Sequence, residues 1–151
     1  MKKTLLLAAI ALFSCAICSA HTIKATDAKV SYIGRTEVNT EEGTVRFDWS
    51  ATTLRVRFKG STLKIKCSDS HKDYFNIWVD KVQCAHQDAT LCVEGDTTLT
   101  LFKGKKGVHE VTFQKRTEAE QGCLTIHELI TDGQFLDAPK GKSRIIEFIG
   151  D

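Results

Sequence analysis

Residues 54–67 read L-R-V-R-F-K-G-S-T-L-K-I-K-C, with apolar and basic side chains alternating on both sides of a Gly-Ser step. Alternation with a period of two is typical of a β-strand that has one buried and one solvated face. Gly60 and Ser61 interrupt the pattern, which predicts a turn there. The stretch therefore predicts a β-hairpin with one basic face and one core face. Cys67 lies in the apolar register, where a buried thiol is one expectation.

The alternation continues along the chain. Residues 44–49 and 75–79 show it, and further strands are expected around Leu99 and Leu101, over residues 108–116, and after Gly122. The residues predicted to face the core in the first two are Val45, Phe47, Trp49, Phe75, Ile77 and Val79. Trp78 is out of phase and is predicted to point away from the core. Many short strands separated by turns, with no helical spacing after residue 20, predict an all-β fold. We expect a jelly-roll-like antiparallel β-sandwich over residues 28–136.

The amino terminus has the pattern of an export signal. Met1-Lys2-Lys3 is basic, residues 5–13 are apolar, and small residues precede a cleavage position after Ala20. The apolar run is too short for a permanent membrane span. Residues 1–20 are therefore predicted to be a signal peptide of a secreted or periplasmic protein. The string L-F-S-C leaves a second alternative, lipid anchoring at Cys15.

Composition limits the remaining possibilities. About 130 residues follow the signal, enough for a single domain with its own core. The 21 basic and 19 acidic residues give a net charge of +2, and no basic stripe is interleaved with aromatic residues. We therefore expect no nucleic-acid partner. No further membrane span and no cofactor are predicted.

The carboxyl-terminal part differs in composition from the strands. Residues 137–143 are polar and contain the one proline of the chain, which predicts a linker. Residues 144–151 read R-I-I-E-F-I-G-D, an apolar run that does not alternate. Such a run is typical of a strand buried on both faces in a parallel sheet, so it predicts the first strand of a second domain.

Four strings carry a resemblance to a known family. Gly34-Arg35-Thr36, the stretch 74–80 (Y-F-N-I-W-V-D) and the stretch 115–119 (K-R-T-E-A, downstream of His109) resemble the amino-terminal jelly-roll domain of family 2 carbohydrate esterases. The closing F-I-G-D resembles the start of the G-D-S block of SGNH hydrolases. The resemblance covers roughly residues 30 to 151.

The resemblance implies that this domain is followed by an SGNH hydrolase domain. In the family, that second domain removes acetyl groups from plant polysaccharides such as xylan and glucomannan, and it holds the Ser-His catalytic pair. The nucleophilic serine would follow Asp151, so we expect no catalytic residue in this chain and no esterase activity from it alone. The implied partners are the missing hydrolase domain and plant cell-wall polysaccharide. Two alternatives to this accessory role remain open, a stand-alone carbohydrate-binding module and a structural cell-surface domain.

Three residues are candidates for interface or glycan contacts. Trp78 is the tryptophan expected to face outward, where its ring could stack on a sugar. Arg116 and Glu118 belong to the K-R-T-E string. This string predicts either a sugar-binding edge, or a domain interface or strand end fixed by a bidentate bond from arginine to a carboxylate.

The cysteines outside the signal are Cys67, Cys84, Cys92 and Cys123. Pairing into disulfides is expected in an oxidising compartment, with free buried thiols as the alternative. Cys84 and Cys92 flank a polar stretch and are the candidate disulfide. No metal site is predicted, because a Cys and a His four positions apart on one strand lie about 13 Å apart. His71, His86, His109 and His127 are expected to be surface or strand-end residues.

Overall fold

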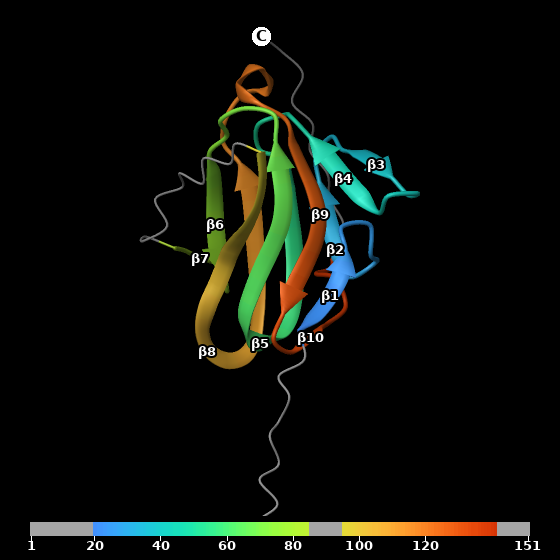
Figure 1. Cartoon of the computed structure of the whole chain (residues 1–151). Coiled ribbons are helices and arrows are strands. Elements are labelled where there is room, and N and C mark those ends of the chain that lie inside the picture. Colours follow the sequence, from blue (N-terminus) through green and yellow to red (C-terminus); the bar gives the residue numbers. More distant parts are fainter. Residues whose placement is uncertain (1–19, 85–94, 142–151) are drawn as a thin grey trace, which may run out of the picture.

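The computed structural model describes residues 20–84 and 95–141. Within these ranges the chain forms ten β-strands and one short 3-10 helix, η1 (Figure 1). The elements are β1 (His21–Lys24), β2 (Val30–Ile33), β3 (Glu37–Asn39), β4 (Thr44–Phe47), β5 (Thr53–Asp69), β6 (Phe75–Val79), β7 (Val82–Gln83), β8 (Gly95–Lys115), η1 (Ala119–Gln121), β9 (Leu124–Thr131) and β10 (Gln134–Phe135). All strand pairs are antiparallel. The prediction of an all-β antiparallel sandwich is confirmed.

The long strands β5 and β8 form the frame of the sandwich. They pair with each other over their whole length, and both bend near the lower end of the molecule in Figure 1. Before the bend, β5 lies between β8 on one side and β2 and β10 on the other, and β6 and β7 extend this layer beyond β8. After the bend, β5 lies between β8 and β9, and β1, β4 and β3 complete the second layer. One strand pair therefore belongs to both layers.

The predicted hairpin at Gly60 is wrong, because β5 continues through that position. The register shifts between Gly60 and Thr62, which is a β-bulge that bends the strand without reversing it. The carboxylate of Asp132 accepts hydrogen bonds from the amides of Ser61 (2.8 Å) and Thr62 (3.0 Å) and so satisfies the groups that the bulge removes from the ladder. The strands predicted around Leu99 and over residues 108–116 are likewise halves of one strand, β8.

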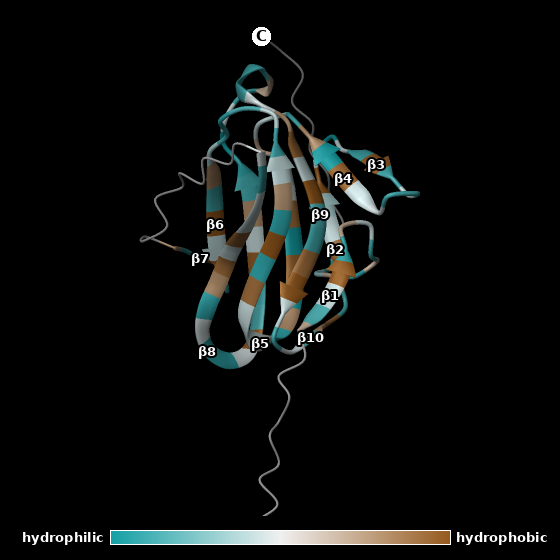
Figure 2. Ribbon diagram, in the orientation of Figure 1, coloured by the Kyte–Doolittle hydropathy of each residue, from teal (hydrophilic) through white to brown (hydrophobic). Residues whose placement is uncertain are grey.

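The core lies between the two layers and follows the predicted alternation. Figure 2 shows hydrophobic and hydrophilic positions alternating along β5, β8 and β9. Phe75 of β6 and Phe113 of β8 stack with their ring centroids 4.5 Å apart. The fully buried apolar residues include Leu54, Val56, Phe58, Leu63, Ile65, Cys67, Val111, Leu124, Ile126 and Leu129. As predicted, Cys67 belongs to this core and Trp78 does not.

Trp49 departs from the prediction that placed it in the core. Strand β4 ends at Phe47, and Trp49 is 49% exposed. The chain turns immediately after the strand, since the Thr52 amide donates to the Trp49 carbonyl at 3.3 Å and Ala51 adopts a φ of 63°. The turn ends the alternation two residues earlier than the sequence suggests.

Two predicted segments cannot be compared with the structure. The signal peptide up to residue 19 and the strand predicted at residues 144–151 lie outside the described residues. In the part of the chain that is described, no helix has the length and apolar character needed to cross a bilayer.

Candidate functional site

Several loops meet at one end of the sandwich, the upper end in Figure 1. Pairing brings the ends of β2, β5, β8 and β9 together there, as in Ile33↔Thr53, Thr53↔Gln114 and Asp69↔Leu124. We call this region the loop end and define it as residues 34–36, 48–52, 70–74 and 116–123. It contains two of the strings that carry the family resemblance.

A buried ion pair fixes the loop end from below. The Lys115 ammonium lies 2.5 Å from the Asp73 carboxylate, and both side chains are fully buried. Lys115 Nζ also donates to the Thr117 hydroxyl (3.0 Å), the Thr117 carbonyl (3.1 Å) and the Glu118 carbonyl (3.1 Å). A buried ammonium needs this set of acceptors to offset its lost hydration. The network therefore fixes the backbone of residues 117 and 118.

Lys115 was not among the residues predicted from the sequence. The expected charged contact at the end of this strand was a bidentate bond from Arg116, but in the described structure Lys115 contacts the buried carboxylate. Arg116 is exposed, and its amide donates to the Tyr74 carbonyl at 2.8 Å. The alternation in the sequence did indicate this position of Lys115. Lys115 is in phase with Val111 and Phe113, so its side chain must point into the core.

A second carboxylate lies beside this ion pair. Asp69 and Asp73 converge on Gly122, where an added Cβ would lie 2.7 Å from Asp69 Oδ1 and 2.9 Å from Asp73 Oδ2. Both Oδ2 atoms are buried and have no hydrogen-bond partner among the described residues. Burial raises the pKa of Asp69 to about 6, and the neighbouring Asp73 charge acts in the same direction, against the bond from the His71 amide. One lysine thus faces two carboxylates, so a proton on Asp69 relieves their repulsion.

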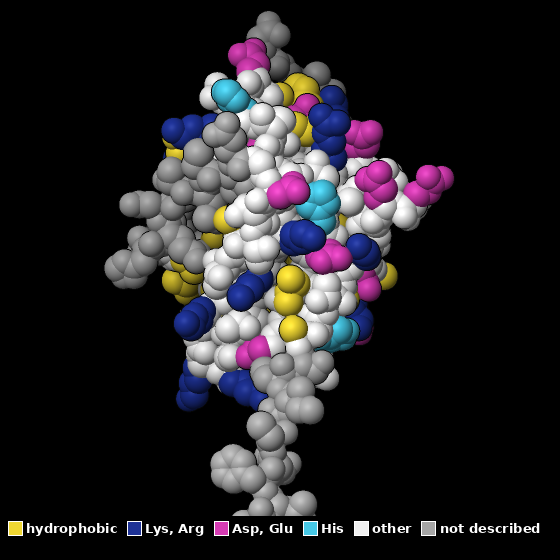
Figure 3. All heavy atoms as spheres, viewed as in Figure 1, with side chains coloured by type: hydrophobic (Ala, Val, Ile, Leu, Met, Phe, Trp, Pro, Cys, Tyr) yellow, Lys and Arg dark blue, Asp and Glu magenta, His cyan; other side chains and the backbone are white. Residues whose placement is uncertain are grey.

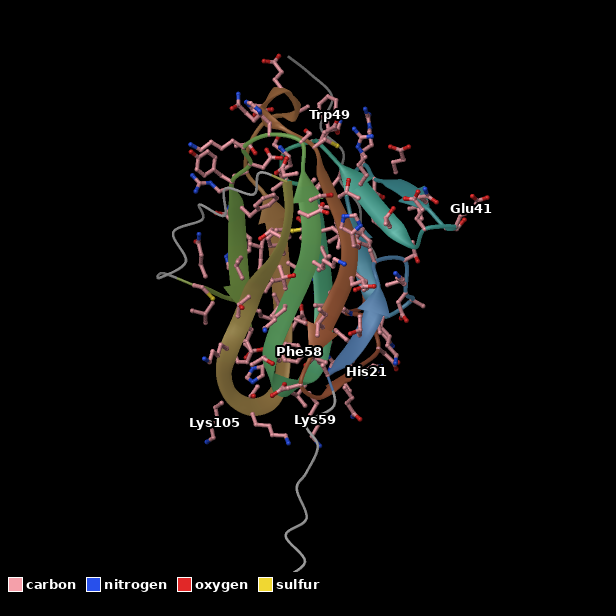
Figure 4. The ribbon with its side chains drawn as sticks, in the orientation of Figure 1. His21, Glu41, Trp49, Phe58, Lys59 and Lys105 are labelled. Carbon is pink, nitrogen blue, oxygen red and sulfur yellow. The ribbon has the colours of Figure 1, made fainter. Side chains whose placement is uncertain are left out.

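A hollow of about 340 Å³ opens beside these loops. It is lined by Arg35, Thr36, Glu37, Arg46, Phe47, Asp48, Trp49 and Cys123. The Arg35 guanidinium lies 5.0 Å from the centre of the Trp49 ring, a cation–π contact. Arg46 Nε donates to Cys123 Sγ at 2.9 Å. Figure 4 shows Trp49 at this end of the molecule, far from Lys105 at the opposite bend.

Another pair of residues from the family-like stretches lies away from the loop end. Asp80 accepts bonds from the Glu110 amide (2.9 Å) and contacts His109 Nδ1 (2.8 Å), while His109 Nε2 lies 2.9 Å from the Lys105 carbonyl. Although burial alone would lower the pKa of His109, these bonds to oxygen acceptors raise it overall. His109 thus ties the bend of β8 to the turn after β6, which is a structural role.

The other predicted histidines lie in different settings. Ser68 Oγ and His127 Nε2 are 2.9 Å apart on neighbouring strands. No carboxylate hydrogen-bonds to His127 within residues 20–84 and 95–141. His71 is exposed, and His86 lies outside the described residues.

The predicted contact residues fall in two places. Arg116 and Glu118 lie at the loop end, where the Ser50 hydroxyl donates to Glu118 at 3.4 Å. Trp78 is half-buried in β6 opposite Thr112, on the outer face of the first layer, and is not part of the loop end. Charged residues of both signs mix on the face drawn in Figure 3.

The described cysteines Cys67, Cys84 and Cys123 form no disulfide with one another. Cys92 lies outside the described residues, so the Cys84–Cys92 disulfide stays a prediction. Burial raises the pKa of the Cys67 thiol to about 12, which leaves it protonated and unreactive. Across the described ranges, no three His, Cys, Asp or Glu side chains are grouped closely enough to hold a metal ion.

Comparison with known proteins gives a consistent result. Residues 32–139 match the family model described as carbohydrate esterase 2 N-terminal. An acetylxylan esterase / glucomannan deacetylase of Cellvibrio japonicus is 30% identical over 136 residues, which are 88% of this chain and 37% of that protein. The structure of a family two carbohydrate esterase from Cellvibrio japonicus superposes with a TM-score of 0.74 at 27% identity, over 83% of this chain and 37% of the other.

A second solved structure shares the fold. A family two carbohydrate esterase from Clostridium thermocellum, in complex with cellohexaose, has a TM-score of 0.69 at 24% identity, over 76% of this chain and 35% of that one. The chain therefore spans little more than a third of the length of the relatives it matches.

Proposed function

This chain belongs to the carbohydrate esterase 2 N-terminal family, and from that membership we propose that it is the accessory domain of an exported polysaccharide acetyl esterase. The family match over residues 32–139, on a sandwich that superposes on the esterase structure, is the observation that carries the proposal. The enzyme would remove acetyl groups from plant polysaccharides, as the name of the Cellvibrio japonicus relative indicates for that protein.

Catalysis is assigned to the hydrolase domain and not to this one. The relatives are much longer than this chain, which leaves room for a separate catalytic domain. Acyl transfer by a serine enzyme needs a nucleophile, an oriented base and oxyanion donors. We assign this set to the hydrolase domain, because the family resemblance implies that the Ser-His pair lies there.

Export is supported by the sequence pattern of residues 1–20. Secretion or a periplasmic location follows from that signal, with lipid anchoring at Cys15 as the alternative.

A second candidate function is a stand-alone carbohydrate-binding module. The observation in its favour is the outer face of the first layer, where Trp78 lies in a row with Thr112 and Arg55. Arg55 is held by Glu110 at 2.7 Å. A single half-buried tryptophan gives a small stacking surface, so we favour the accessory role.

Two measurements on the purified chain separate these functions. The accessory role predicts no release of 4-nitrophenol from 4-nitrophenyl acetate above a heat-treated control, and saturable turnover would contradict it. It also predicts no retardation in affinity electrophoresis through acetylated xylan or glucomannan. Retardation that is lost in Trp78→Ala would instead establish the binding module.

A positive test requires the hydrolase domain. The corresponding part of the Cellvibrio japonicus relative, produced alone and joined after Asp151 of this chain, is the partner to use. The accessory role predicts that the joined protein keeps esterase activity at temperatures that inactivate the hydrolase part alone. Equal heat inactivation of the two would contradict it.

A further inference from the structure

Two of the sequence strings that resemble the family lie at the loop end, and their charged side chains there are outside the core. Gly34-Arg35-Thr36 lies beside the turn at residues 48–52, since an added Cβ on Gly34 would be 3.0 Å from the Thr52 hydroxyl. Residues 116–118 lie on the other side of the same turn. Arg35, Arg116 and Glu118 are all exposed. These three exposed charged side chains are therefore available to a partner at one end of the sandwich.

Large apolar side chains are exposed at the loop end and directly beside it. Trp49 is 49% exposed and Ile33, at the end of β2, is 53% exposed. Trp49 lines the hollow together with Arg35 and Arg46, and Ile33 directly precedes Gly34 of the loop end. Tryptophan and arginine are the residues most enriched in the energetically important parts of protein interfaces. The composition therefore fits a contact surface for another protein domain.

The backbone of this surface is held in place before any partner arrives. The Ala51 amide donates to the Lys115 carbonyl (2.9 Å), and the Lys115 amide donates to the Thr52 carbonyl (3.0 Å). The Lys115 side chain, which is itself fully buried, fixes residues 117 and 118 from below. A preformed surface loses little conformational entropy on docking.

The course of the chain leads toward the same end. After β10 the Leu136 amide donates to the Arg57 carbonyl at 2.9 Å. Because β10 is antiparallel to β5, the chain then runs toward the beginning of β5 at Thr53, which adjoins the loop end. In this family the following sequence is the one that leads into the hydrolase domain.

We propose that the loop end is the docking surface for the hydrolase domain, with Arg35, Trp49, Arg116 and Glu118 as its main contact residues. The inference rests on the proposed accessory function and adds the face through which that function is carried out. The exposed face of the first layer around Trp78 is the alternative docking surface, and the experiment distinguishes the two.

The test uses the full chain, alone and joined after Asp151 to the hydrolase part of the Cellvibrio japonicus relative. Hydrogen–deuterium exchange followed by mass spectrometry reports backbone protection along the chain. We expect exchange in peptides covering residues 46–52 and 116–121 to slow in the joined protein. Peptides covering the turn at residues 79–83 should exchange at the same rate in both proteins.

A double variant, Trp49→Ala with Arg116→Ala, tests whether these side chains make the contact. It should lose the added protection and the gain in heat resistance of the esterase activity, while the melting temperature of the full chain alone stays within a few degrees of wild type. The matched control is Val82→Ala, a valine that is 70% exposed in the turn between β6 and β7. This control should keep both the protection and the gain.

Each alternative result has a separate meaning. Protection over residues 76–78 and 110–114 in place of the loop end would overturn the docking surface and leave the accessory function standing. The absence of added protection anywhere, together with unchanged heat inactivation of the hydrolase part, would overturn both.

Discussion

The carboxylate of Asp132 accepts a hydrogen bond from the amide of Ser61 at 2.8 Å, across the bend of β5. The same oxygen atom accepts the Thr62 amide at 3.0 Å, and the Ser61 hydroxyl donates to the other oxygen atom. The residue that closes the bulge therefore directly follows β9 and is 71 positions away in sequence. This contact holds the two layers in their relative positions where β5 passes from one to the other.

Asp132→Ala should lower the free energy of unfolding by about 1.5–3 kcal/mol, because the amides of the bulge lose a charged acceptor. Asp132→Asn keeps one oxygen acceptor and should cost less. Urea unfolding of the variants at pH 7 measures both values. Equal stability of wild type and Asp132→Ala would show that the bulge does not need this contact.

Asp132 should also make the free energy of unfolding depend on pH in the acid range. The Ser61 hydroxyl and the bulge amides lower the pKa of Asp132 from 3.8 to about 2. A carboxyl with a lowered pKa in the folded state stabilises the fold above its unfolded value, and this contribution is lost as pH falls through about 2. Unfolding free energies measured between pH 4 and 2 should therefore decline less steeply in Asp132→Asn than in wild type.

Lys115→Met should be among the most destabilising single changes in this domain. It leaves the Asp73 carboxylate buried without a counter-charge, which typically costs about 3–5 kcal/mol. Adding Asp73→Asn should restore part of the loss, since the uncompensated charge is then removed as well. Lys72→Met is the matched control, because Lys72 is exposed one residue from Asp73 and should change stability by less than about 0.5 kcal/mol. Thermal melts of the four proteins would show a contradiction if Lys115→Met matched Lys72→Met.

Asp69 predicts a pH dependence of the opposite sign to that of Asp132. Its pKa in the folded protein is raised to about 6, so the folded state binds a proton more tightly than the unfolded chain does. This stabilisation is complete below the ordinary value of 3.8 and is lost as pH rises through about 6. Asp69→Asn should flatten the decline of unfolding free energy between pH 4 and 7. An unchanged slope in the variant would mean that the carboxyl pair over Gly122 does not hold a proton.

The predicted Cys84–Cys92 bridge can be tested by mass spectrometry of a digest made without reduction. A linked peptide pair containing both cysteines is expected, and its reduction should lower stability by roughly 2–3 kcal/mol through loss of loop closure. Cys67 serves as an internal control, because its buried thiol should react with a labelling reagent only after unfolding. Recovery of Cys84 and Cys92 as separate labelled thiols would contradict the bridge.

The alternation in the sequence was sufficient to predict the faces of the strands but not where the strands bend. Leu54, Ile65 and Val111 face the core as their register indicates. The turn predicted at Gly60 is a bulge because Asp132 satisfies its amides, and no local pattern around Gly60 contains that information. Trp49 was misplaced for a similar reason, since the turn at residues 48–52 depends on the positive φ of Ala51, which sequence rules do not favour.

The candidate site could be predicted in part. Arg116 and Glu118 were singled out from a string, and the structure places both at the loop end. The residues that hold that string in place, Lys115 and Asp73, were missed because a buried ion pair requires a partner whose position only the fold determines. Lys115 itself could have been noticed as a charged residue in a core-facing register.

The strand pair β5 and β8, which belongs to both layers, couples the unfolding of one layer to that of the other. Strands β5 and β8 run through both layers. Separating one layer from the other would therefore break the β5–β8 ladder in the middle of both strands. Partial opening by loss of a single layer is therefore unfavourable, and the amides of both layers should share one global unfolding event in native-state exchange. Cooperativity of this kind would suit the accessory role proposed above, because a chain that opens locally is open to proteolysis.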